Sequence, residues 1–402
     1  MIENPEILPH KNKSKRLARL KNRRQLWLSV HLWLGLVLGL FLSIFGITGS
    51  ILVFHAEIDE LLNPTLLTVV QSTDNTCYEP LADIFEAGRE AMPTQAKLTF
   101  ATYPRNDNAA FSLSYTLTSA FDISENWQVY VNPYTTKVIG TRLMGRSDSL
   151  LPNTFINLIF KLHYALLIKP EEVSAVVVGL SGALLMISVL TGLIVWWPLT
   201  GRWWQALTVK SKSGCVRFNY DLHKVFGFYT ALVMLPVLFS GVYMVLPHQV
   251  VPVLELFSPV TYRYWFQSTP TLGTDSITMA QAVSITDKRY PTGRLDWIYG
   301  VTDSTSTYTV CKNGVEESGS ILHRRCVVMD RYNGKILDVD DPSIGTAGEV
   351  FTHWQWPLHS GQAFGMTGRI LVFLSGLACP VLFITGVIRW LQKRRAKRTK
   401  RS

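Results

Sequence analysis

Hydrophobic residues are concentrated in four long blocks along the 402-residue chain, at about 25–54, 173–197, 222–246 and 366–390. Each block is near or above the ~20 residues that a membrane-spanning helix needs. The pattern predicts an α-helical membrane protein whose four spans form a bundle. The first block is too long for the apolar core of a signal peptide, and 54–57 lacks a small-x-small cleavage pattern, so we expect this block to be retained.

Two long polar segments separate the spans, and each is predicted to hold a helix followed by strands that meet at a turn. The turns at 131–138 and 329–336 carry the Asn, Pro and Gly residues that hairpins use. This indicates a weak internal repeat and two small α+β modules. The expected helices are 81–92 and 278–290, and the expected strands are 111–117, 127–138, 306–311 and 326–337.

The distribution of charge predicts the orientation of the chain. Its formal net charge is +10, but residues 1–26, 198–218 and 389–402 together carry +18 and the remainder carries −8. By the positive-inside rule, both termini and the middle loop face the cytoplasm. The membrane topology thus explains the positive net charge, and we expect no nucleic-acid partner.

The predicted organisation follows from these blocks and charges. It comprises a basic tail (1–24), a first span (25–55), an outer module (56–165), a second span (172–197), a cytoplasmic loop (198–218), a third span (219–247), a second outer module (248–362), a fourth span (366–391) and a basic tail (392–402).

Four histidines lie at matching depths near the ends of the spans. His31 and His223 follow flanking arginines by seven and six residues, or about 10 Å along a helix from the cytoplasmic face. His163 and His359 precede the second and fourth spans by ten and seven residues, near the outer face. Because ionisable residues within spans are costly and usually functional, and a six-coordinate b-type haem needs two axial ligands, we predict two haems. The first pair would ligate the inner haem and the second pair the outer haem.

The other five histidines receive weaker assignments. His55 and His353 are alternative outer ligands. His248 is predicted to be an interfacial surface residue, and His10 and His323 are predicted to be solvated.

Glycines beside two of the histidines would let a flat macrocycle approach the backbone: Gly35 and Gly39 near His31, and Gly361 and Gly365 near His359. Helix packing is the competing explanation, because other glycines in the spans have no expected histidine neighbour: Gly179, Gly182, Gly376 and Gly386.

Rival chemistries fit the sequence less well. A catalytic zinc site needs three or four converging ligands, and no His-Glu-x-x-His spacing occurs. The Ser181 segment lies within a span, which is no setting for a hydrolase nucleophile. The cytoplasmic parts are too short for a nicotinamide or flavin domain, so a quinol or a separate reductase would have to supply electrons. Cys311 and Cys326 flank an expected hairpin on the oxidising side and either form a disulfide or remain free thiols.

Several motifs resemble the PepSY-associated transmembrane family over essentially the whole chain. They are VHLWLG at 30–35 with GITG at 46–49, DLHKVFG at 221–227, and LHSGQ at 358–362 followed by FG at 364–365. Family members include ferric-siderophore reductases of the bacterial inner membrane. The resemblance implies PepSY-like periplasmic modules and a haem-dependent oxidoreductase that takes a ferric siderophore as substrate. The alternative is a non-catalytic scaffold that binds a partner in iron uptake.

Overall fold

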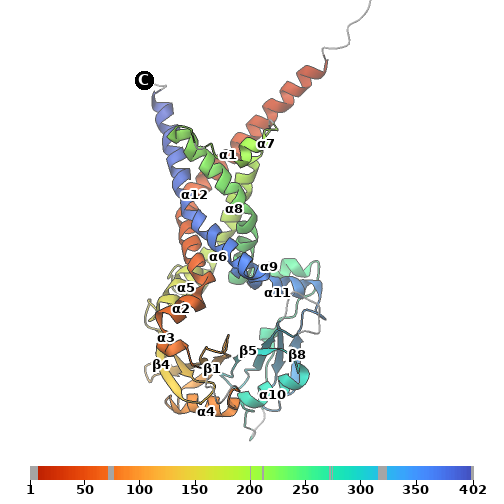
Figure 1. The fold of residues 1–402 in the computed structure, drawn as a ribbon. Helices are drawn as coiled ribbons and strands as arrows, with labels where there is room; N and C mark the ends of the chain where they lie inside the picture. Colours follow the sequence, from red (N-terminus) through yellow and green to blue (C-terminus); the bar gives the residue numbers. More distant parts are fainter. Residues whose placement is uncertain are drawn as a thin grey trace, which may run out of the picture. The chain divides into compact units, whose positions relative to one another are not determined.

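The computed structural model describes residues 8–70, 77–199, 201–210, 212–270, 273, 275–315 and 324–399, and it divides into two compact units (Figure 1). A helical unit comprises the described parts of Met1–Val53, Leu162–Pro247 and Gln355–Ser402. A sheet unit comprises Phe54–Lys161 and His248–Trp354.

The helical unit contains the four expected spans. They are α1 (Leu8–Val53), α6 (Glu171–Trp196), α8 (Cys215–Val245) and α12 (Gly365–Thr399). Each contains a stretch long and apolar enough to cross a membrane. α1 and α8 each contact both α6 and α12, so the four helices form a ring with α1 and α8 at opposite corners. The short helix α7 (Trp203–Leu207) packs on α8.

Small residues bring α1 and α12 together. A side chain on Gly46 or Gly376 would collide with the carbonyl of the other glycine, and the Ser50 hydroxyl donates a 2.8 Å hydrogen bond to the Phe373 carbonyl. Close backbone approach of this kind is how helices associate where the surroundings are as apolar as the side chains. Helix packing, the competing explanation for glycine, therefore accounts for Gly376.

The sheet unit contains one antiparallel sheet of eight strands in the order β4-β3-β2-β1-β5-β6-β7-β8. The two expected modules are therefore two four-stranded meanders that share a single sheet, joined where β1 pairs with β5. The strands are β1 (Lys97–Thr102), β2 (Phe111–Thr118), β3 (Ser124–Val131), β4 (Val138–Arg146), β5 (Arg294–Tyr299), β6 (Tyr308–Asn313), β7 (Arg325–Met329) and β8 (Ile336–Asp340).

One hydrophobic core spans both meanders. The expected helices form as α4 (Leu81–Glu90) and α10 (Met279–Arg289), and their apolar faces pack on the sheet. α10 begins with a capping box between Thr278 and Gln281 that satisfies backbone N–H groups at its first turn. The other helices of this unit are α2 (His55–Leu62), α3 (Pro64–Leu67), η1 (Arg263–Trp265) and parts of α5 (Phe155–Ala165), α9 (Pro247–Glu255) and α11 (Ala347–Ser360).

The predicted repeat is visible in the two matching turns. Asn132 begins the turn before β4, and its side-chain oxygen accepts a 2.9 Å hydrogen bond from the Tyr134 N–H. Asp330 occupies the same place before β8 and accepts a 2.8 Å bond from the Tyr332 N–H. Both residues also bond through their own N–H to a lysine carbonyl five residues later. The side chains thus replace the backbone partners that a tight turn loses.

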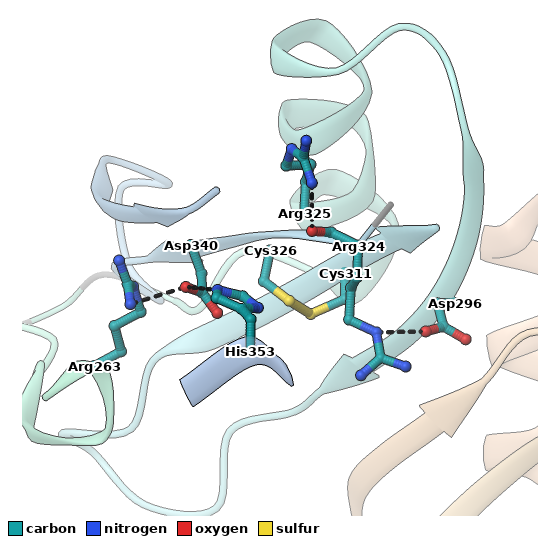
Figure 2. Close-up of a disulfide and its surroundings, with 8 residues drawn as sticks. All are labelled: Arg263, Asp296, Cys311, Arg324, Arg325, Cys326, Asp340 and His353. Atoms are coloured by element: carbon teal, nitrogen blue, oxygen red, sulfur yellow. Dashed lines mark hydrogen bonds and ion pairs between the residues drawn. A yellow bond between two sulfur atoms is a disulfide. The ribbon is translucent and has the colours of Figure 1, made fainter. Parts of the chain in front are cut away.

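Cys311 and Cys326 are bonded in a disulfide, which resolves the alternative that the sequence left open (Figure 2). They lie directly opposite each other on β6 and β7, and both are buried. The next strand places Asp340 opposite Cys326, and its carboxylate accepts bonds of 2.8 Å from both His353 and Arg263. This edge of the sheet is therefore held by a covalent link and an ion-pair network.

Candidate functional site

The helical unit brings the imidazole rings of His31 and His223 close together. His31 lies on α1 and His223 on α8, at opposite corners of the ring. Their ring centres are 6.2 Å apart, and the ring planes are inclined by 65°. Two helices that do not follow one another in the chain thus contribute one imidazole each.

A second pair consists of His163 and His359. His163 is near the end of α5 and His359 near the end of α11, and both belong to the helical unit although they precede the spans in sequence. Their ring centres are 5.9 Å apart at an angle of 64°. The two pairs therefore share nearly the same geometry.

The Nδ1 atom of each of the four imidazole rings forms a hydrogen bond. The acceptors for the first pair are the Ser188 carbonyl, 2.8 Å from His31, and the Thr385 hydroxyl, 2.9 Å from His223. For the second pair they are the Thr48 hydroxyl, 2.9 Å from His163, and the Val237 carbonyl, 2.9 Å from His359. A carbonyl can only accept, so His31 and His359 carry the proton on Nδ1 and a lone pair on Nε2. The hydroxyls of Thr48 and Thr385 each donate to a carbonyl of their own helix, so their oxygens accept from the same tautomer of His163 and His223.

The spacing of both pairs suits two imidazoles that share one metal ion. Histidines that bind a metal through one nitrogen usually donate the other N–H to a fixed acceptor, as these rings do. A metal–nitrogen bond of about 2.0–2.1 Å, with about 1.1 Å from nitrogen to ring centre, places two ligating rings about 6.3 Å apart. The observed separations of 6.2 and 5.9 Å agree with this value.

Within the described residues, no group of three or more His, Cys, Asp or Glu side chains could hold a metal ion. A zinc centre of the usual kind needs at least three such ligands.

A polar cluster ties α8 to its neighbours beside the first pair. Asp221 is buried two residues before His223, and it forms ion pairs with Arg217 at 2.9 Å and Lys224 at 3.0 Å. The Asn219 amide donates a 3.0 Å hydrogen bond to the carbonyl of Thr385, the residue whose hydroxyl contacts His223. The Asn219 hydrogen bond therefore joins α8 to α12 beside His223, and the ion pairs of Asp221 lie within α8.

The other three histidines whose side chains the structure describes take no part in the two ring pairs. His55 begins α2 in the sheet unit, and His248 lies in α9. His353, the other alternative ligand, engages Asp340 through Nε2 (Figure 2). His323 lies outside the described residues, and for His10 only the backbone in α1 is described.

The glycines that contact the histidines differ from those expected. A Cβ on Gly35 or Gly365 would meet no atom within 4 Å, whereas one on Gly39 would meet Phe383 and one on Gly361 the backbone of α12. Gly386, expected to have no histidine nearby, packs against His223: its Cβ would lie 3.3 Å from the ring. That expectation was wrong because it considered only neighbours in the sequence. The other contacting glycines are Gly49, Gly192 and Gly241.

The fold and the site together define a multi-pass membrane protein whose helical bundle presents paired histidines. A family model described as the PepSY-associated TM region matches residues 28–393, and the chain belongs to this family. No curated protein matches the chain. The family assignment confirms the resemblance seen in the motifs, and the match extends across both units.

Proposed function

We propose that this protein carries electrons across a membrane through two b-type haems, one held by His31 and His223 and the other by His163 and His359. The observation that carries the proposal is the repeated geometry of the pairs. Ring centres are 6.2 and 5.9 Å apart, and hydrogen bonding of Nδ1 in each of the four rings leaves Nε2 as the nitrogen available to a metal.

The charge asymmetry supports an orientation for this path. If the protein lies in a bacterial inner membrane with both termini in the cytoplasm, the His31–His223 pair is the inner site and the His163–His359 pair is the outer site. The inner site would receive electrons from a quinol or a separate reductase. The sheet unit would then lie in the periplasm and present a docking surface to the substrate.

The substrate that best suits this path is a ferric siderophore. Each haem, when bound, supplies a one-electron redox centre. The imidazoles hold and orient it, the acceptors at Nδ1 set the basicity of the ligands, and the apolar spans exclude water. Transfer of one electron converts chelated Fe(III) to Fe(II). Hard catecholate and hydroxamate oxygens bind Fe(II) far more weakly, so the iron is released.

The absorption spectrum of the purified protein tests the proposal directly. We expect a red protein with a Soret band that shifts when dithionite is added, and about two haems per chain. With a ferric siderophore and an Fe(II)-trapping dye, the reduced protein should be reoxidised as the dye complex forms. A colourless protein would refute electron transfer and support the scaffold function. Haem without reoxidation by any ferric chelate would refute the substrate class alone.

A further inference from the structure

The four histidines share a local environment that recurs in every span. His31 contacts α6 and His223 contacts α12, while His163 contacts α1 and His359 contacts α8. In each case the ring lies against a helical segment that carries a hydroxyl residue directly followed by glycine. The four segments are Thr48-Gly49, Thr191-Gly192, Ser240-Gly241 and Thr385-Gly386.

The glycine of each segment makes room for the imidazole. A Cβ on Gly192 would lie 2.9 Å from Cε1 of His31, and one on Gly49 would lie 3.0 Å from Cε1 of His163. The corresponding distances are 3.1 Å at Gly241 and 3.3 Å at Gly386. Carbon atoms in favourable contact are about 3.5–4.0 Å apart, so a methyl group at any of these positions would displace the ring.

The hydroxyl residue of each segment contacts either the Nδ1 atom of the histidine or the carbonyl that accepts from it. The Thr385 hydroxyl donates to the Val381 carbonyl at 2.7 Å, which leaves its oxygen free to accept from His223. The Thr48 hydroxyl donates to the Ile44 carbonyl at 2.6 Å and is placed in the same way beside His163. Ser240 lies 3.1 Å from the Nδ1 of His359. Thr191 bonds at 2.9 Å to the Ser188 carbonyl, the acceptor for His31.

The segments also follow the twofold repeat of the chain. Gly49 follows His31 by 18 residues on α1, and Gly241 follows His223 by 18 residues on α8. The two histidines in the first half of the chain, His31 and His163, contact segments on α6 and α1, which also belong to the first half. The two in the second half, His223 and His359, contact segments on α12 and α8, which belong to the second half. Each ring pair is then completed by one histidine from each half of the chain.

We propose that these four Ser/Thr-Gly segments are positioning elements for the haem ligands: the glycine admits the imidazole, and the neighbouring hydroxyl or carbonyl fixes its Nδ1 proton. This inference rests on the proposed function and extends it to residues that contact the ligands. It assigns each segment to one site. Gly192 and Gly386 serve the His31–His223 site, and Gly49 and Gly241 serve the His163–His359 site.

Single Gly→Ala variants of the full-length protein test the steric part, with haem content and the low-spin EPR signal as readouts. Gly192→Ala and Gly386→Ala should lower occupancy or change the EPR signal of the inner site only, with the larger effect at Gly192, where the contact is closer. Gly49→Ala and Gly241→Ala should do the same to the outer site. The unaffected site in each molecule reports that the bundle has folded. Gly145→Ala is the control, because Gly145 lies on β4 in the sheet unit and its Cβ would meet no atom within 4 Å.

Thr385→Val tests the hydrogen bond. It removes the oxygen beside His223, makes the imidazole a weaker electron donor and should shift the midpoint potential of the inner site upward, and Thr385→Ser should restore it. Thr230→Val is the control, because the Thr230 hydroxyl makes the same bond to its own helix, at 2.6 Å to the Phe226 carbonyl, and contacts no histidine among the residues that the structure describes. Four results would each overturn the assignment. They are equal effects at both sites, wild-type spectra in all four glycine variants, loss of haem in Gly145→Ala alone, and an unchanged potential in Thr385→Val.

The haem-free protein separates failure of this inference from failure of the proposed function. If wild type contains no haem, ¹⁵N NMR of the histidine rings still reports the Nδ1–H tautomer. We then expect each Gly→Ala variant to shift the resonances of its own histidine. Four unchanged spectra would refute the positioning segments independently of any cofactor.

Discussion

Replacing the four paired histidines one at a time by alanine should divide them into two groups. His31→Ala and His223→Ala should remove the inner haem and retain the outer one, and His163→Ala and His359→Ala should do the reverse. A haem that loses one of its two protein ligands is held by a single bond and is readily lost during purification. Haem content should fall from two per chain to about one in every single variant.

The separation of the two sites along the bundle explains why the losses should be independent. On α1, His31 belongs to one site and Thr48 contacts a histidine of the other, and they are 17 residues apart. At 1.5 Å per residue this is about 26 Å. A double variant within one pair should therefore lose no more haem than either single variant. A double variant across the pairs, such as His31→Ala with His163→Ala, should lose both haems.

The assay combines the haem-to-protein ratio with iron reduction. All four single variants should fail to reduce a ferric siderophore with a donor at the inner site, because the path needs both centres. An artificial donor added from the periplasmic side should restore reduction in the inner-site variants only. His248→Ala is the control and should retain both haems. Full haem content in all four variants, or loss of both haems in each, would refute the assignment of ligands.

Three further predictions concern the topology and the sheet unit. A reporter fused after Ser402 should be active in the cytoplasm and one inserted near Asn108 in the periplasm; cytoplasmic activity near Asn108 would contradict the orientation. Cys326→Ser should lower the free energy of unfolding by about 3 kcal/mol, the value for a closed loop of about 15 residues, and mass spectrometry of unreduced wild type should find neither Cys311 nor Cys326 alkylated. Burial alone would raise the pKa of the Asp330 carboxyl, but three backbone N–H groups outweigh it and hold the pKa below its ordinary value. Asp330→Asn should therefore cost about 1–3 kcal/mol at neutral pH by urea unfolding. Because the folded pKa is the lower one, this difference is complete above the unfolded pKa of about 3.9 and should shrink as the pH falls below it; a pH-independent difference would refute the cause.

Much of this architecture is predictable from local pattern. Four apolar blocks of sufficient length indicate the spans, and the periodic segments at 81–92 and 278–290 indicate the helices that form as α4 and α10. Matching turn residues reveal the repeat of the sheet unit. The depth of His31 and His223 relative to flanking arginines, and the distances of His163 and His359 from the following spans, separate the four into the two pairs that the bundle forms. These features depend on residues close together in the chain, so the sequence alone determines them.

The tertiary structure decides which surfaces meet. Strands β1 and β5, neither of which the pattern indicated, join the two meanders into one sheet because each supplies backbone hydrogen bonds that the other half lacks. Gly386 and His223 are neighbours only because α12 packs on α8. Hydrophobic periodicity predicts that one face of a helix or strand is buried, but it does not show which other element packs on that face. The sequence therefore determined the spans, the depth of the histidines and the repeat, whereas only the packing of distant helices showed which glycines and hydroxyls hold each ring.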